Sequence, residues 1–320
     1  MKTRLFALLL CSALLGLASA SKASGFDPGF ADFSAAVKER SVDYELMSFS
    51  MMPGEATRIA IPEEHRDEGP VELNASGGRL EATGNWTWEW QAPETPGLQT
   101  LRLKREGQRG IQLNVFVLTP ASRIENGYLD GYRMGRYPSR PLRGDPIYRK
   151  PSGFIRVDAD MVDLPLSPHF TLGQFLCKQQ PDHWPKYLLV RTDLLIKLEK
   201  ILAEVNARGV RTDTFTVMSG YRTPWYNEAI GNGRYSRHVW GGAADIFIDT
   251  TGDGRMDDLT GDDRSDIRDA KWLRAIVNEM FHQPPHRRLV GGLGLYGPRP
   301  HRGPFVHVDV RGHEAHWDLP

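Results

Sequence analysis

The stretch Ser236–Asp245, which reads SRHVWGGAAD, places His238 seven residues before Asp245, with two adjacent glycines, Gly241 and Gly242, between them. Two helical turns span about 7.2 residues, so a continuous helix would bring the histidine and the aspartate to one face. Each glycine, however, costs a helix about 1 kcal/mol relative to alanine. We therefore predict a loop that carries His238 and folds back over a strand that carries Asp245, with the glycines permitting a tight backbone turn.

A second stretch, Phe305–Arg311 (FVHVDVR), alternates valine with other residues in the period of a β-strand. The valines would face the core, while His307 and Asp309 would project together from the opposite face, with Cβ atoms about 7 Å apart. His238, Asp245 and His307 make a ligand set suited to zinc, with water in the open fourth position of a catalytic site. Each residue alone also has a structural interpretation, as a turn residue, a cap or a half-buried histidine. The zinc prediction depends on their joint pattern.

Length and charge limit the class of protein. The chain has 320 residues, enough for two domains of about 100–200 residues each. Lysine plus arginine and aspartate plus glutamate number 40 each, so the formal net charge is zero. No overall field would attract the protein to nucleic acid or to an anionic membrane. Any charged partner must therefore be recognised locally.

Residues 1–20 have the layout of a secretory signal peptide. Lys2 and Arg4 precede an apolar run, and Ala18–Ala20 forms a small-residue cleavage pattern. Cleavage there leaves Cys177 as a single cysteine, which cannot form an internal disulfide. No later segment has the roughly 18 apolar residues of a membrane span. We expect an exported, periplasmic protein without a membrane span.

Residues 25–120 contain short runs with the alternation of β-strands, separated by turns rich in glycine and proline. This pattern predicts an all-β, immunoglobulin-like antiparallel sandwich of about seven strands. Trp86, Trp88 and Trp90 would project from one face of a single strand. A row of indoles can stack on sugars, but a sandwich core uses large aromatic residues in the same way, and we favour the core.

Residues 121–155 form a connector rich in arginine, proline and glycine. This density of prolines and glycines disfavours a long helix or strand, so we predict a semi-rigid connection between two domains. Its local positive charge suits an anionic polymer such as a cell-wall strand. The alternative is a solvated linker packed across the domain junction.

Residues 156–320 mix helical and strand patterns, which predicts an α+β domain with a small antiparallel sheet. Apolar residues recur at helical spacing from Leu188 to Val205, ahead of a terminating Gly209. The other predicted elements are helices at 223–230 (capped by Thr223) and 265–281, and strands at 213–220, 243–249, 290–296 and 303–310.

Several motifs of this region occur together, namely S-x-H-x-x-G-x-A-x-D (Ser236–Asp245), SGYRTPWYN (Ser219–Asn227) and HVD (His307–Asp309). The set resembles the zinc D-alanyl-D-alanine metallopeptidases, whose fold is shared by the hedgehog signalling domain. The approach LSPHFTLGQFLCKQ (Leu166–Gln179) is similar to the lead-in segment of the bacterial exported members. The resemblance covers roughly residues 160–317 and does not include the sandwich.

The resemblance implies that His238, Asp245 and His307 bind zinc. It also implies that Arg222 holds the scissile carbonyl and stabilises its developing oxyanion, and that Ser236 contacts the substrate. A guanidinium suits this role because it offers a fixed charged fork without a proton to lose. The structural alternative for Arg222 is a surface arginine at the start of a helix.

The chain departs from many relatives at the general base. Those relatives place a His two residues, or a Glu three residues, before the last zinc histidine, where this chain has Phe305 and Pro304. Neither can accept a proton. We predict that Asp309, two residues after the ligand as in a subgroup of relatives, is the base. The alternative is that Asp309 orients a ligand imidazole by accepting its other N–H.

Two further motifs fit metal sites less well. Residues 249–257 (DTTGDGRMD) resemble the first nine positions of a calcium loop, but position twelve is Thr260, where a bidentate Glu belongs. A loose calcium site and a solvated acidic turn are the two interpretations. In HEAHW the histidines are three apart, one short of the helical zinc-protease motif, so we interpret His313 and His316 as surface or packing residues.

These features predict an exported zinc peptidase that hydrolyses stem or cross-link peptides of peptidoglycan, as a murein endopeptidase with a β-sandwich accessory domain. A bound zinc lowers the pKa of its water and polarises a carbonyl, the two needs of amide hydrolysis. The alternatives are a D,D-carboxypeptidase that trims terminal D-alanine, and a non-catalytic cell-wall-binding protein that retains a structural zinc.

Overall fold

The computed structural model describes residues 25–281 and 288–319 of the chain. The predicted signal peptide, residues 1–20, lies outside them. Within the described residues, no helix is both long and apolar enough to cross a membrane.

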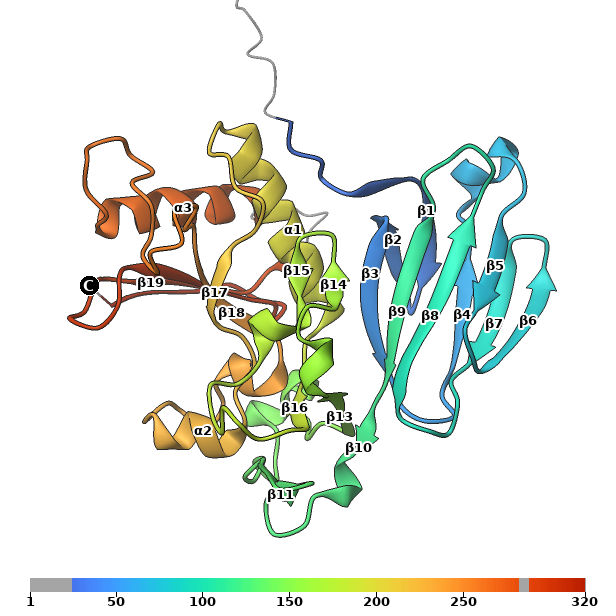
Figure 1. Ribbon diagram of the computed structural model, residues 1–320, viewed down its shortest axis with the longest axis horizontal. Coiled ribbons are helices and arrows are strands. Elements are labelled where there is room, and N and C mark those ends of the chain that lie inside the picture. The colour runs from blue at the N-terminus through green and yellow to red at the C-terminus, as the bar shows by residue number, and fades with distance from the viewer. Residues whose placement is uncertain (1–24, 282–287, 320) are drawn as a thin grey trace, which may run out of the picture.

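The N-terminal part consists of two sheets that lie face to face (Figure 1). One sheet has the order β2-β1-β4-β7-β6 and the other the order β3-β9-β8-β5. The first comprises β1 (Phe30–Val37), β2 (Arg40–Tyr44), β4 (Ala56–Ala60), β6 (Arg79–Gly84) and β7 (Thr87–Gln91). The second comprises β3 (Leu46–Met51), β5 (Glu72–Ala75), β8 (Gly97–Lys104) and β9 (Ile111–Val117).

The sandwich differs from the sequence prediction in two respects. It has nine strands in its two sheets rather than about seven, and β3 pairs with β9 in parallel, so the strands are not all antiparallel. An immunoglobulin-like arrangement is not confirmed. The indole row does belong to the core: Trp88 and Trp90 are buried, and Trp90 Nε1 donates to the carbonyl of Gly77 (2.9 Å). Burial of this kind leaves those two rings unable to stack on a sugar.

The C-terminal part is built on a five-stranded sheet of order β17-β18-β20-β19-β21. Its strands are β17 (Thr216–Ser219), β18 (Ala243–Phe247), β19 (Gly292–Tyr296), β20 (Phe305–Asp309) and β21 (Ala315–Leu319). Four of the five pair antiparallel, but β21 lies parallel to β19, so the predicted antiparallel sheet is in fact mixed. His316, interpreted as a surface or packing residue, thus lies in the edge strand β21, and His313 precedes that strand.

Two helices, α1 (Thr192–Ala207) and α3 (Ile267–Phe281), pack on one another beside this sheet, and α3 contacts β19 and β20 (Figure 1). The apolar stripe of α1 is buried, as its spacing predicted. The helix begins at Thr192 and not at Leu188, because Leu188 pairs with Ile155 in a short strand. The third helix, α2 (Pro224–Ala229), begins where predicted, and the Thr223 hydroxyl accepts from Tyr226 N–H as its cap.

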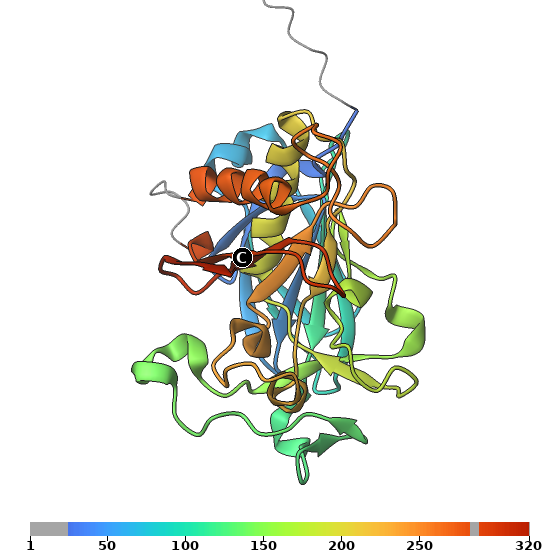
Figure 2. The same ribbon diagram turned by 90° about the vertical axis from the view of Figure 1, so that its left-hand side faces the viewer.

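The connector 121–155 is ordered and packs on the C-terminal part. It contains the short strands β11 (Tyr128–Leu129) and β12 (Tyr132–Arg133) and runs into β13 (Gly153–Val157). β13 joins β10 (Thr119–Pro120) and β16 (Lys186–Leu188) in a small sheet, and the hairpin β14 (Pro165–Ser167) and β15 (Phe170–Thr171) follows. In Figure 2 the connector, in green, lies at one end of the molecule, below the sheet that carries β18 and β20.

The sandwich is fixed to α1 by polar contacts as well as by apolar packing. Arg40 at the start of β2 donates twice to the buried carboxylate of Asp193, at 2.6 and 2.9 Å. The Thr192 hydroxyl donates to the carbonyl of Ser48 in β3 (2.8 Å). The buried apolar residues of the two parts form one continuous cluster. The junction therefore resembles a core contact rather than a free hinge.

We expect Arg40→Ala to lower the free energy of unfolding by about 1–3 kcal/mol, because it leaves the Asp193 carboxylate buried without its charged partner. Arg58→Ala is the matched control, since Arg58 is exposed on β4 of the same sheet. Urea unfolding of both variants measures the difference. If the two variants showed equally small changes in the free energy of unfolding, the Arg40–Asp193 contact would not stabilise the junction.

Candidate metal centre

His238 is presented by a single turn of 3-10 helix, Arg237–Trp240, that ends abruptly at Gly241. Gly241 has φ +63°, a left-handed conformation that other residues rarely adopt. A Cβ at this position would also collide with the backbone of Leu189. The chain then enters β18 at Ala243, so the turn folds back over the strand, as the two glycines predicted.

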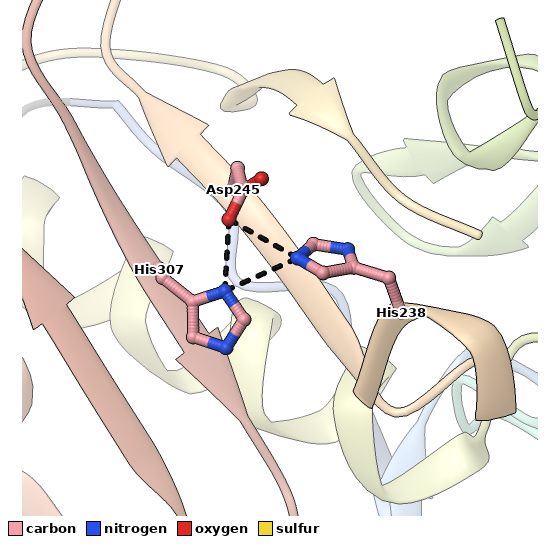
Figure 3. A group of neighbouring side chains, drawn as sticks. All are labelled: His238, Asp245 and His307. Atoms are coloured by element: carbon pink, nitrogen blue, oxygen red, sulfur yellow. Dashed lines mark hydrogen bonds and ion pairs between the residues drawn. The ribbon is translucent and has the colours of Figure 1, made fainter. Parts of the chain in front are cut away.

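Asp245 and His307 face each other across β18 and β20, where they are direct register partners. His307 Nδ1 lies 2.8 Å from Asp245 Oδ1. His238 Nε2 lies 3.2 Å from the same oxygen and 3.1 Å from His307 Nδ1. All three side chains are buried and point toward one another (Figure 3). The sequence prediction that these residues come together is thus met in the fold.

The hydrogen bonds behind the two imidazoles determine which nitrogens face the centre. His238 Nδ1 is 2.7 Å from the Gly220 carbonyl oxygen, which can only accept, so Nδ1 carries the proton. His307 Nε2 is 3.3 Å from Asp309 Oδ2, so Nε2 carries the proton there. With these protons in place and both rings neutral, His238 Nε2 and His307 Nδ1 would each present a lone pair to Asp245 Oδ1. A cation, whether a metal ion or a proton, fits between these three atoms.

The donor set fits zinc. Zn–N bonds of about 2.0–2.1 Å in a tetrahedral site place ligand nitrogens about 3.3 Å apart, close to the separation found between His238 and His307. Among the described residues, His238, Asp245 and His307 form the one group of histidine, cysteine or acidic side chains arranged to hold a metal.

The three side chains of the centre shift one another's pKa values. Burial lowers the pKa of His238. Burial also acts to lower the pKa of His307, but its hydrogen bonds to Asp245 and Asp309 outweigh burial and raise it. For Asp245 burial acts to raise the pKa, yet His238 and His307 hold it well below the usual range. Asp245 is therefore an anion, as a metal ligand must be.

Asp309 lies behind His307 and has no free side toward the pocket. Its carboxylate accepts from the His307 imidazole, from the Arg311 guanidinium and from the backbone N–H of Gly292. Burial acts to raise its pKa, but His307 and Arg311 outweigh burial and lower it. A carboxylate so occupied is poorly placed to receive a proton from water in the pocket. The geometry therefore favours the second predicted role, orienting the His307 ring, over that of general base.

Arg222 lies at the centre rather than on the surface. One terminal nitrogen donates to Asp245 Oδ2 (2.6 Å), the oxygen on the far side from the two imidazoles, and Nε donates to the Ser219 hydroxyl (2.8 Å). These two contacts fix the plane of the guanidinium beside the candidate metal position. The SGYR motif thus places a rigid cation where the resemblance implied one.

The candidate ligands line a pocket of about 390 Å³, together with Arg222 and Ser236. The rest of the wall comes from separate segments and consists of Leu142 and Tyr148 of the connector, Asn232, Tyr235, Arg237, Tyr296, Arg302, Phe305, Arg311 and Trp317. Trp317 Nε1 donates to the Tyr296 hydroxyl (3.0 Å), and the indole packs 5.0 Å from the His307 ring. Strand alternation puts Phe305 and Arg311 on the same face as His307, but sequence reasoning missed the other residues of the wall, which only the fold brings together.

The connector also holds the turn that carries His238. Tyr137 OH donates to the Val239 carbonyl (2.9 Å), and Trp240 Nε1 donates to the Arg149 carbonyl (2.9 Å). The aromatic rings of this region pack edge to face, with Tyr148 5.3 Å from Trp240. The segment 121–155 is therefore a structural part of the site.

The acidic loop 249–257 uses its carboxylates within the loop. Asp249 accepts from the backbone N–H groups of Gly252, Asp253 and Gly254. Asp257 accepts from the N–H and hydroxyl of Thr250. Among the residues that the structure describes, these side chains do not gather into a metal-holding group, which favours the acidic turn over the calcium site.

Comparison with known proteins adds one finding. Residues 168–260 match the family model described as Peptidase M15, whose members are zinc D-Ala-D-Ala carboxypeptidase-type enzymes. A search of curated proteins gave no match. The matched segment includes Arg222, His238 and Asp245, while His307 and Asp309 follow it. The resemblance predicted for the C-terminal half is confirmed by this match, which covers residues 168–260.

Proposed function

We propose that the protein is a zinc-dependent peptidase that hydrolyses peptidoglycan peptides, and that it acts as a murein endopeptidase. The observation that carries the proposal is the convergence of two imidazole lone pairs and the Asp245 carboxylate on one point of a pocket that also contains Arg222. The family match over residues 168–260 supports a metallopeptidase. His238, Asp245 and His307 are the proposed zinc ligands.

Each residue of the pocket has a proposed part in the chemistry. Zinc in this site would polarise the scissile carbonyl and make a bound water acidic. Arg222 is held by Ser219 and Asp245, so its charge is available to the developing oxyanion without reorganisation. Ser236 lines the same pocket and is proposed to contact the substrate backbone. Asp309 keeps the His307 proton on Nε2 and so keeps Nδ1 free to bind the metal.

Asp309→Asn is expected to lower zinc affinity by about 10- to 100-fold, because the ring of His307 loses the carboxylate that fixes its tautomer. Competition with a fluorescent chelator measures the affinity, and thermal unfolding controls for loss of the Arg311 contact. When zinc is added to saturation, the variant should recover most of its activity. A zinc-saturated variant that stays inactive would restore Asp309 as the general base.

One observation favours a second candidate, a non-catalytic wall-binding protein with a structural zinc. Among the described residues that line the pocket, the only imidazole and carboxylate groups are those of His238, Asp245 and His307. The described lining therefore offers no general base apart from the candidate ligands. Against this candidate stands the rigid Arg222, which a purely structural zinc site does not need.

Digestion of cross-linked muropeptides separates the candidates. We expect the zinc-loaded protein to convert muropeptide dimers to monomers and to lose this activity when a chelator removes the metal. Mass spectrometry of the products reads the outcome. Release of free alanine with the dimers intact would indicate a D,D-carboxypeptidase instead, and no chelator-sensitive cleavage would leave the wall-binding protein as the better account.

A further inference from the structure

Two large aromatic side chains are exposed at the end of the molecule that carries β11 and α2 (Figure 1). Tyr128 of β11 is 48% exposed, and Trp225 at the start of α2 is 39% exposed. Tyr128 and Arg133 are direct register partners in the hairpin β11–β12, so their side chains leave the same face of it. The Arg133 guanidinium in turn lies over the Trp225 ring, 4.7 Å from its centroid. We call these three side chains the surface row.

The backbone that carries the surface row is fixed. The hairpin turns at Asp130 and Gly131, whose φ angles of 46° and 80° are both positive, as a two-residue type I′ turn requires. The buried Gln179 amide donates to the carbonyl of Arg133 (2.8 Å) and to the hydroxyl of Thr223 (3.0 Å), the cap of α2. One side chain thus joins the hairpin to the first turn of the helix. The row is therefore held in place before any ligand binds.

The polar groups of the surface row keep their hydrogen-bonding capacity. Among the residues that the structure describes, no oxygen accepts from the Arg133 guanidinium, which only contacts the Trp225 ring. The Tyr128 hydroxyl likewise has no hydrogen-bond partner in the described chain. The row thus combines two flat apolar rings with unused donors. A sugar ring matches both features, because its C–H groups pack on an aromatic face while its oxygens accept hydrogen bonds.

The exposed area of the row favours a narrow ligand over another protein. At about 150–250 Å² for a whole aromatic side chain, the exposed fractions of Tyr128 and Trp225 amount to on the order of 150–200 Å². A stable protein interface takes about 800 Å² from each partner. The other exposed large hydrophobic residues of the described chain are Ile230 and Leu319, and even with both the apolar area stays far below that value.

The surface row is near the candidate metal centre along the chain. Trp225 follows Arg222 by three residues, which span at most about 11 Å. Arg133 belongs to the connector, which also supplies Leu142 and Tyr148 to the pocket wall. A ligand that occupies the pocket can therefore extend to the row. In peptidoglycan, the peptides branch from a strand of N-acetylated sugars.

We propose that the surface row binds the glycan strand of peptidoglycan. Sugar rings pack on Tyr128 and Trp225, and an acetamido carbonyl accepts from Arg133. The choice of this glycan rests on the proposed function, in which peptides of the same polymer are hydrolysed in the pocket. The inference narrows the substrate class, because a peptide still attached to its N-acetylhexosamine chain is held at two places and a free peptide at one.

Binding of a glycan without peptides tests the inference. The probe is chitohexaose, an oligomer of N-acetylglucosamine, and calorimetry measures its affinity for the full chain. Wild type should bind it, and Trp225→Ala and Tyr128→Ala should each weaken binding about tenfold or more, because each removes one packing surface. Arg133→Gln should weaken the binding of chitohexaose more than that of cellohexaose, which has no acetamido group.

Ile230→Ala is the matched control. Ile230 is 45% exposed as the C-cap residue of α2 and is not part of the row, so chitohexaose should bind this variant to within about twofold of wild type. Thermal unfolding of each variant checks the fold. If Trp225→Ala does not fold, Tyr128→Ala decides, because its side chain makes no hydrogen bond in the described chain. Equal binding by wild type and all variants would overturn the inference, and so would no binding by wild type, which would leave a protein as the occupant.

Failure of the proposed function would be visible separately. Binding of chitohexaose requires no hydrolysis, so glycan binding without cleavage of any muropeptide would reject the peptidase and keep the inference. Cleavage of muropeptide dimers by a protein that does not bind chitohexaose would do the reverse.

Discussion

The pairing of β18 with β20 is the constraint on which the site depends. It places Asp245 directly opposite His307, so the carboxylate and one imidazole meet without any contribution from flexible loops. A slip of one residue would turn His307 to the opposite face of the sheet and bring a valine to its place. The buried Val306 and Val308 oppose such a slip, because they would then leave the core. Apolar packing on one face therefore sets the relative positions of Asp245 and His307 on the other.

The position of the third candidate ligand, His238, depends on a turn rather than on strand pairing. His238 sits on a short turn that only a left-handed Gly241 allows to reverse over β18. The turn has little internal stability, and it is held from outside by the connector, through the carbonyl of Arg149 and the hydroxyl of Tyr137. The site is thus assembled from the strands β18 and β20, a turn that depends on Gly241, and the connector 121–155. The connector precedes residues 168–260, which match the family model. Sequence variation in the connector would alter the pocket wall without changing the three candidate ligands.

The sequence was sufficient for the parts of the fold that follow local rules. Strand alternation located β20 and the face that carries His307, the glycine pair predicted the turn before β18, and Thr223 marked the start of α2. It was insufficient where partners are distant in the chain. The parallel pairings of β3 with β9 and of β21 with β19 have no local signature, because register between remote strands is decided by tertiary packing. For the same reason the presence of Arg302 and of the connector in the pocket wall emerged only from the fold.

The central claim is that His238, Asp245 and His307 together hold one zinc ion. The most direct measurement is the metal content of the purified, dialysed protein and of two single variants. The account predicts about one zinc per chain for wild type and for His313→Ala, whose histidine is exposed and outside the site, and no bound zinc for His307→Ala. A His307→Ala protein that keeps stoichiometric zinc would contradict the account.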